Sequence, residues 1–199
     1  MEQYLDARVK RYVQKRLFSK IDKTKTILGL AGTHPEKYIE VLPYHKQVIL
    51  VDFNPVNDSV RRNSLVGEFD LINSQPAHYS PITFVDCDFC KSILSCGDDL
   101  LYIYNKMKRS TVKNKYIAFT FSLRGVGLTK TWQWLKENFK ELNIQSNVPL
   151  SSLDDITNLN LIQKRQYVRQ YYDSTGHPIN LYGYRDSGAC MISGLIKVA

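Results

Sequence analysis

Short apolar runs alternate along this chain with longer segments in which apolar residues recur every three or four positions. The short runs are rich in β-branched and aromatic residues and predict strands; they cover residues 26–28, 48–51, 69–73, 81–85 and 116–121. The periodic segments predict helices, which cover residues 3–19, 34–42, 57–65, 95–107, 129–142 and 151–173. Two further apolar runs, 179–184 and 189–196, flank a turn and predict a closing β-hairpin.

Strands that alternate with helices predict an α/β fold, because consecutive parallel strands are joined by a helical crossover. We therefore expect a doubly wound, mainly parallel sheet with helices on both faces and a C-terminal antiparallel β-hairpin. A chain of 199 residues suits a single domain. Within it we expect a basic N-terminal helix over residues 1–20, and an inserted linker and helix over residues 144–178 before the hairpin.

The composition is ordinary for a globular protein, with 43% hydrophobic and 23% charged residues. No apolar run approaches the ~20 residues that a membrane-spanning helix needs, and the N-terminal region lacks the uninterrupted apolar core of a secretory signal. The cysteines, Cys87, Cys90, Cys96 and Cys190, are too few and too clustered for a disulfide framework, and no further ligand stands at zinc spacing. We expect a reducing, cytoplasmic location and no metal.

The formal net charge of +8 favours a polyanionic partner such as a nucleic acid, since cations that neutralise phosphates supply affinity for any sequence. Two segments concentrate the cations. The N-terminal helix carries Arg8, Lys10, Arg11, Lys15 and Arg16, and the helix predicted over residues 151–173 carries Lys164, Arg165 and Arg169 between tyrosines. Cations beside aromatic rings suit phosphates and bases. Solvated helix surfaces, with tyrosines half-buried against the sheet, are the structural alternative.

Residues 26–55 have the order of a nucleotide-binding βαβ unit. An apolar strand passes into a small-residue turn, a helix starts near Pro35, and a second strand ends at Asp52. In such units the turn and the helix start let a nucleotide-like cofactor approach the backbone, and an acid about 20 residues further on binds the ribose hydroxyls. A βαβ unit with a small turn also occurs where no cofactor binds.

Polar residues follow the strand predicted over residues 81–85, at the strand end where open parallel sheets bind ligands. Three chemistries fit this stretch: Asp86 and Asp88 as ligands of a divalent cation, Cys87 as a nucleophile, or a binding pocket built on Asp86. A solvated loop fits it as well. Arg124 follows the next strand, so we expect it at the same rim, to bind a substrate phosphate or one of these acids.

The order of these elements, the turn at residues 29–33 and the acid at Asp52 resemble the class I S-adenosylmethionine-dependent methyltransferases. The family usually has an acid where Gly29 stands and glycines where Ala31 and Thr33 stand. In its members that methylate amino groups of nucleic acids, an acid or amide, two prolines and an aromatic follow the fourth strand. Asp86 and Phe89 match that motif, whereas Cys87 and Asp88 replace the prolines.

The resemblance implies a methyltransferase that uses S-adenosylmethionine and acts on nucleic acid, with an exocyclic amine of a base as one acceptor. It implies that the cofactor is bound by Gly29, Leu30, Ala31, Gly32, Thr33, Asp52, Asn54 and Asn73. It implies catalytic roles for Asp86, Phe89 and Arg124, in which the aromatic ring stacks on an extruded base. Two alternatives remain: a catalytically inactive subunit of the same fold, and a metal-dependent nuclease that uses Asp86 and Asp88.

Overall fold

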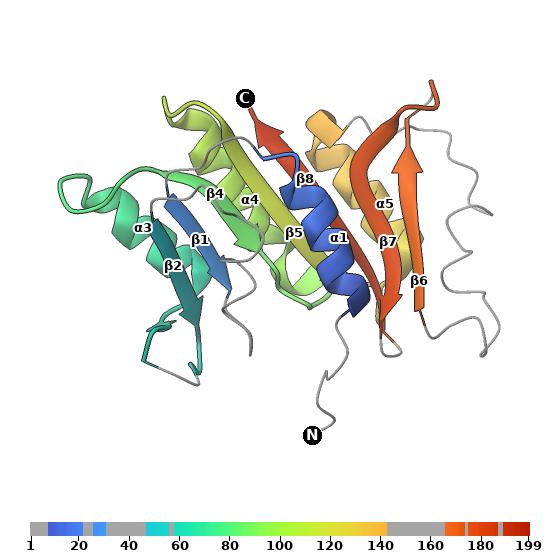
Figure 1. Cartoon of the computed structure of the whole chain (residues 1–199), viewed down its shortest axis with the longest axis horizontal. Helices are drawn as coiled ribbons and strands as arrows, with labels where there is room; N and C mark the ends of the chain where they lie inside the picture. The colour runs from blue at the N-terminus through green and yellow to red at the C-terminus, as the bar shows by residue number, and fades with distance from the viewer. Residues whose placement is uncertain are drawn as a thin grey trace.

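The computed structural model of the chain describes residues 8–21, 26–30, 47–55, 58–142, 166–173, 175–186 and 189–199. These residues form one mixed sheet with helices on both of its faces (Figure 1). The helices are α1 (Arg8–Phe18), α3 (Leu65–Ser74), α4 (Ile93–Arg109) and α5 (Gly127–Asn138), followed by a 3-10 turn, η1 (Lys140–Leu142). None of the helices among these residues is long and apolar enough to cross a membrane.

The sheet formed by the described residues has the strand order β3-β2-β1-β4-β5-β8-β7-β6. Its strands are β1 (Thr26–Leu30), β2 (Gln47–Asp52), β3 (Arg61–Arg62), β4 (Ile82–Cys87), β5 (Lys115–Ser122), β6 (Gln166–Tyr172), β7 (Pro178–Asp186) and β8 (Ala189–Val198). The strands from β3 to β5 are parallel, whereas β8, β7 and β6 each run antiparallel to the preceding strand in this order. The predicted fold class, including the β7–β8 hairpin, is confirmed, and β6 adds an edge strand beyond the hairpin.

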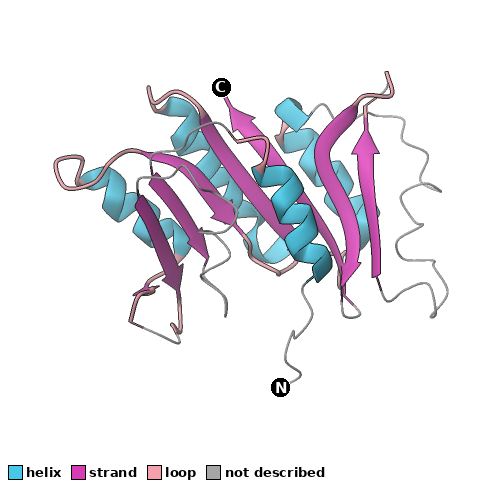
Figure 2. Ribbon diagram, viewed as in Figure 1, coloured by secondary structure: helices cyan, strands magenta, loops and turns pink. Residues whose placement is uncertain are grey.

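Successive side chains of each strand point to opposite faces of the sheet, so the hydrophobic core has one part on each face. In β5, Ile117 and Phe119 point to the face covered by α3, α4 and α5, whereas Tyr116 and Ala118 point to the face covered by α1. Figure 2 shows α1 lying across the near face and the other helices behind the sheet. As predicted, Trp132 and its neighbours on α5 and η1 are core residues. Helices pack on both faces of the central strands, and this packing positions the carboxyl ends of those strands.

The segment before β4 differs from prediction, because residues 65–74 form helix α3 rather than a strand over 69–73. The helix begins at Ser64, whose Oγ accepts a hydrogen bond from the backbone N–H of Gly67 at 2.9 Å. Leu65, Phe69 and Ile72 then recur at helical spacing and are all buried. The helix predicted over 57–65 is also wrong, because part of this segment is a turn and the two-residue strand β3.

The segment before the hairpin also differs from prediction, because residues 166–172 form strand β6 and not the end of a helix. Tyr171 packs edge-on against Trp132, with ring centroids 4.7 Å apart, whereas Val168 packs on the α1 side. Buried contacts on opposite faces follow the two-residue period of a strand. The rest of the predicted 151–173 helix and the helix predicted over 34–42 lie outside the described residues.

Candidate functional site at the carboxyl edge of the parallel strands

The strand order reverses between β1 and β4. From β1 the chain passes outward to β2 and β3, then returns to the other side of β1 to form β4. In open α/β sheets, ligands bind outside the carboxyl ends of the strands at such a switch point. Here the register pairs Gly29 of β1 with Asp86 of β4 and with Leu50 of β2. Asp52 lies one residue beyond Val51, the partner of Leu30.

Gly29, Asp52 and Asp86 lie on the same face of the sheet, the one that α1 covers. The residues that precede them, Leu28, Val51 and Val85, belong to the core on the opposite face. Because successive residues of a strand face opposite sides, Gly29, Asp52 and Asp86 face α1. The predicted small-residue turn begins later than expected, because Gly29 and Leu30 are still part of β1. Ala31, Gly32 and Thr33 lie outside the described residues.

Asp52 is half-buried at the end of β2. Its Oδ1 accepts a hydrogen bond from the backbone N–H of Asn54 at 3.0 Å, and its carbonyl accepts one from the N–H of Asn63 at 3.2 Å. Among the described residues, no hydrogen bond to Oδ2 of Asp52 is found. Asn54 holds Asp52 through its backbone, and its own side chain is exposed.

Asp88, two residues beyond Asp86, is held beneath α1. Its side chain is only 4% exposed and forms an ion pair with Lys10 Nζ at 2.8 Å. Gln14 Nε2 donates to Oδ2 at 3.4 Å, and Cys90 Sγ donates to Oδ1 at 3.2 Å. Lys10 and Gln14, one helical turn apart, thus fix the same flank of α1 over the end of β4.

The environment of this ion pair changes the pKa of each nearby group. Burial by itself would lower the pKa of Lys10, but the charge of Asp88, the hydrogen bond to it and the nearby Cys90 and Tyr184 together outweigh burial and raise that pKa above its ordinary value. Burial, with the charge of Asp88, raises the pKa of Cys90 to about 11. Burial also raises the pKa of Tyr184, whose side chain is fully buried beside this cluster. Lys10 therefore remains protonated at neutral pH, whereas the thiol and the phenol remain neutral.

The cysteine and metal alternatives gain no support here. Burial raises the pKa of the Cys87 thiol well above its usual range, and the charge of Asp86 adds to the rise, so the thiolate that a nucleophile needs is strongly disfavoured. The described residues contain no group of three or more histidine, cysteine, aspartate or glutamate side chains that could hold a metal ion. A cation at Asp86 and Asp88 would also have to compete with Lys10.

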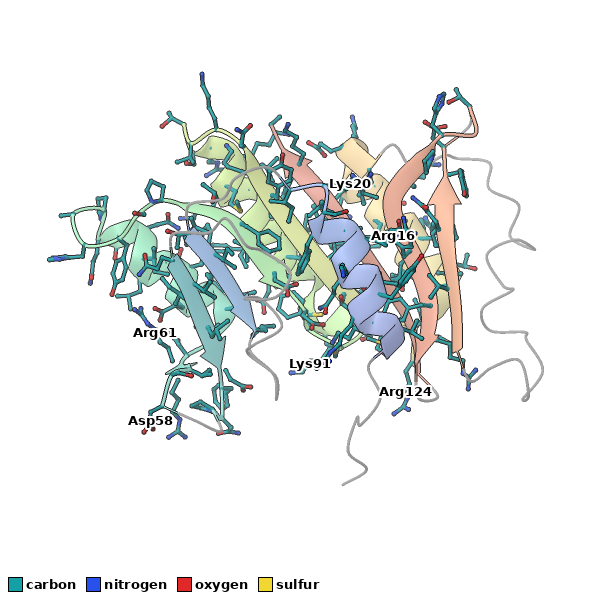
Figure 3. All side chains as sticks on the ribbon, in the orientation of Figure 1. Arg16, Lys20, Asp58, Arg61, Lys91 and Arg124 are labelled. Atoms are coloured by element: carbon teal, nitrogen blue, oxygen red, sulfur yellow. The ribbon has the colours of Figure 1, made fainter. Side chains whose placement is uncertain are left out.

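Phe89 and Arg124 differ in how they relate to Asp86. The Phe89 ring stacks on Phe121 with centroids 6.4 Å apart, and it packs against the core on the face opposite α1. The predicted pairing of Phe89 with Asp86 is therefore not found, because apolar contacts hold the ring in the other core. Arg124 is exposed at the same edge as the ends of β1 and β2 (Figure 3). Among the described residues it forms no ion pair, and Lys10 is the cation that binds Asp88.

Asn73 lies away from this edge. It was expected to end a strand, but it lies in the last turn of α3, where its Nδ2 donates to the carbonyl of Phe69 at 2.8 Å. It lines a cavity of about 540 Å³ together with Ile82 and Lys115, the first residues of β4 and β5. Because that cavity is at the amino ends of the strands, a contact between Asn73 and a ligand at the carboxyl edge is not supported.

The predicted nucleic-acid cations fall into three groups. Arg11, Lys15 and Arg16 are exposed on α1, whereas Lys10 is directed inward by its ion pair with Asp88. Lys164 and Arg165, and the side chains of Arg8 and Arg169, lie outside what the structure describes. Sequence reasoning missed Gln14 and the inward role of Lys10. Their spacing of four residues on one flank of an amphipathic helix was the available signal.

No protein-family model matches the chain, and no curated protein matches it by sequence. Several solved structures resemble it in shape. They include methyltransferases. An rRNA methylase from Streptococcus thermophilus aligns over 94% of this chain and 95% of its own, with 10% identity and a TM-score of 0.36. The N-methyltransferase NodS from Bradyrhizobium japonicum, in complex with S-adenosyl-L-homocysteine, aligns over 95% of this chain and 86% of its own, with 9% identity and a TM-score of 0.40.

A DUF574 family protein from Streptomyces avermitilis aligns over 100% of this chain and 86% of its own, with 10% identity and a TM-score of 0.45. The strand order and the residues of this chain itself carry the proposal that follows.

Proposed function

We propose that this protein is an S-adenosylmethionine-dependent methyltransferase that acts on nucleic acid. The observation that carries the proposal is the carboxyl edge at the β1–β4 switch point, where Gly29, Asp52 and Asp86 share one face of the sheet. A side-chain-free position beside a strand-end carboxylate is what an adenosine-containing cofactor requires at such an edge.

The residues around Asp52 are suited to bind the ribose of the cofactor. Asp52 is fixed by the Asn54 N–H through one oxygen, and the other oxygen can accept hydrogen bonds from ribose hydroxyls. Gly29 and Leu30 end β1 next to it, and we assign Ala31, Gly32 and Thr33 to the methionine moiety. Bound S-adenosylmethionine supplies an activated methyl carbon, so the protein has to position an acceptor in line with it and to exclude water.

Asp86 is the residue that we assign to the acceptor. It is 2% exposed, lies on the same face as Asp52, and is separated from it by β1 alone. A buried carboxylate there can accept a hydrogen bond from an amine and orient its lone pair. Arg124, exposed at the same edge, is assigned to a substrate phosphate, for which the guanidinium is suited. Phe89 takes no part in this scheme because its ring is packed on Phe121.

The nucleic-acid part of the proposal is supported by charge. The chain carries a net charge of +8, and exposed cations of α1, namely Arg11, Lys15 and Arg16, lie on the helix that covers this face. Their long side chains can neutralise phosphates of a strand that approaches the carboxyl edge.

Calorimetric titration with S-adenosylmethionine tests the cofactor site. We expect the wild type to bind and Asp52→Ala to lose most of the affinity, since it removes the ribose acceptor. Asp58→Ala is the matched control, because Asp58 is an exposed acid only six residues further along the chain. Equal binding by wild type and Asp52→Ala, or no binding by wild type, would refute the proposed cofactor site.

Methyl transfer from tritiated S-adenosylmethionine to total RNA and to total DNA tests the reaction. We expect label in one of the two nucleic acids, and a large loss of rate in Asp86→Asn without loss of cofactor binding. Cofactor binding without transfer to either substrate would instead identify an inactive subunit of the same fold.

A further inference from the structure

Two exposed tyrosines and an exposed arginine lie on the α1 side of the sheet. Tyr12 of α1 is 48% exposed and Tyr172 of β6 is 51% exposed, although both are large and aromatic. Arg16 Nε donates to the hydroxyl of Tyr12 at 3.2 Å, and its guanidinium carbon lies 5.3 Å from the centre of the Tyr12 ring. We call Tyr12, Arg16 and Tyr172 the tyrosine–arginine patch.

The fold brings these residues together from distant parts of the sequence. Tyr12 and Arg16 are one turn apart and form the flank of α1 opposite to Lys10 and Gln14. That flank faces β7 and β6, both of which contact α1, and Figure 3 shows Arg16 beside β7. Tyr172 turns to the α1 side because its strand neighbour Tyr171 is buried against the opposite core.

A fourth residue, Tyr182 of β7, is buried in the core on the same face of the sheet. Burial raises the pKa of its phenol, the charge of Arg16 opposes that rise, and Tyr12 and Tyr172 add to it. All three members of the patch are therefore close enough to Tyr182 to affect its ionisation.

Positive charge around the patch favours a nucleic acid as its partner. Arg11, Lys15 and Lys20 of α1 and its C-terminal turn are exposed nearby, and Figure 3 shows Lys20 on the same face as Arg16. Cations that track a phosphate backbone, next to rings on which successive bases stack, are the two components of surfaces that bind single strands. A duplex keeps its base faces stacked within itself and cannot use the rings.

We propose that the tyrosine–arginine patch stacks unpaired bases of a single-stranded nucleic acid. The inference rests on the nucleic-acid part of the proposed function and deepens it by naming the form of the substrate and the residues that hold it. The patch lies on the same face as Asp52 and Asp86, so one strand can contact both α1 and the carboxyl edge.

Fluorescence anisotropy with labelled single strands of about 12 nucleotides tests the inference. The probes are an RNA, the DNA of the same sequence and a duplex of it, titrated without cofactor at about 0.1 M salt, where charge contacts still contribute. We expect Tyr12→Ala and Tyr172→Ala each to bind the single strand at least about fivefold more weakly, because one stacked base is lost. Tyr12→Phe keeps the ring and is expected to bind within about twofold of wild type.

Tyr102→Ala is the matched control. Tyr102 of α4 is also an exposed tyrosine beside a cation, with Lys106 Nζ 5.3 Å from its ring centre, but α4 packs on the opposite face of the sheet. A 2-aminopurine base in the probe reports stacking directly. We expect the wild type and Tyr102→Ala to change its fluorescence on binding, and Tyr12→Ala to change it much less.

Three results would overturn the inference. If both alanine variants bind the single strand as tightly as the wild type, or if the duplex binds as well as the single strand, the patch is not a stacking site. Binding of the cofactor without binding of either single strand would overturn this inference and the nucleic-acid part of the proposed function, and leave the cofactor site standing. Patch-dependent strand binding without cofactor binding would support the patch and refute the methyltransferase.

Discussion

Replacing Lys10 by methionine removes the cation of the Lys10–Asp88 ion pair, while the carboxylate stays buried. The Asp88 side chain is 4% exposed, so water cannot replace the lysine, whereas the Lys10 side chain is 21% exposed. Loss of one partner of a buried ion pair costs about 3–5 kcal/mol. Gln14 and Cys90 still donate hydrogen bonds to Asp88, which places the expected loss at the lower limit, about 3 kcal/mol.

Urea unfolding, followed by circular dichroism, measures this loss. For a chain of this length, about 3 kcal/mol corresponds to a fall in Tm of roughly 6–12 °C. Lys15→Met is the control, because Lys15 is exposed on the same helix and its removal should change stability by less than about 0.5 kcal/mol. The double variant Lys10→Met, Asp88→Asn removes both charges and is expected to recover most of the loss. The reasoning would be wrong if Lys10→Met were as stable as Lys15→Met.

The pH dependence of this contribution follows from the direction of the Lys10 shift. The folded state raises the pKa of Lys10 above the value of 10.5 that it has when unfolded. The contribution is therefore fully present below pH 10.5 and is lost only as the pH rises through the higher folded value. Between pH 7 and pH 9, the difference in unfolding free energy between wild type and Lys10→Met should not decline through titration of this lysine.

Three further predictions concern packing, reactivity and helix capping. A Cβ added at Gly194 would lie 2.4 Å from Cζ of the buried Phe119 ring, so Gly194→Ala should lose about 1–3 kcal/mol in urea unfolding. Since the pKa of Cys90 is about 11 against an ordinary 9.0, its thiolate fraction at pH 8 is about 100-fold lower, and mass spectrometry should show that iodoacetamide alkylates this exposed thiol slowly. Ser64→Ala removes the acceptor for the Gly67 N–H and should lower the unfolding free energy by about 1 kcal/mol.

The central strands were predictable because their residues are apolar on both faces. The run at 116–121 predicted β5, which spans Lys115–Ser122, and all but the last of its residues are buried. The α5 segment was predictable for a similar reason, since Trp132 and Leu135 keep the spacing of one buried helical face. In both cases a local pattern and the tertiary contacts favour the same structure.

Two segments were misassigned because short patterns fit both kinds of element. Residues 69–73 contain a short apolar run, but the Ser64 cap and buried positions three and four residues apart make them part of α3. Residues 166–172 carry an arginine and several tyrosines in an order that suits a helix. They form a strand because the edge of β7 supplies hydrogen-bond partners and Trp132 covers Tyr171. Neither partner is adjacent in sequence.

The sequence by itself determined the alternation of strands and helices, and with it the edge at which Asp52 and Asp86 lie, because parallel strands joined by crossovers end on one side. The tertiary structure alone decided which side chains meet there. It placed Lys10 on Asp88, turned Phe89 into the opposite core, moved Asn73 to the far edge and brought Tyr12 and Tyr172 to the same face of the sheet. These contacts join elements far apart along the chain, and only the packing of α1, α3 and β6 against the sheet determines their positions.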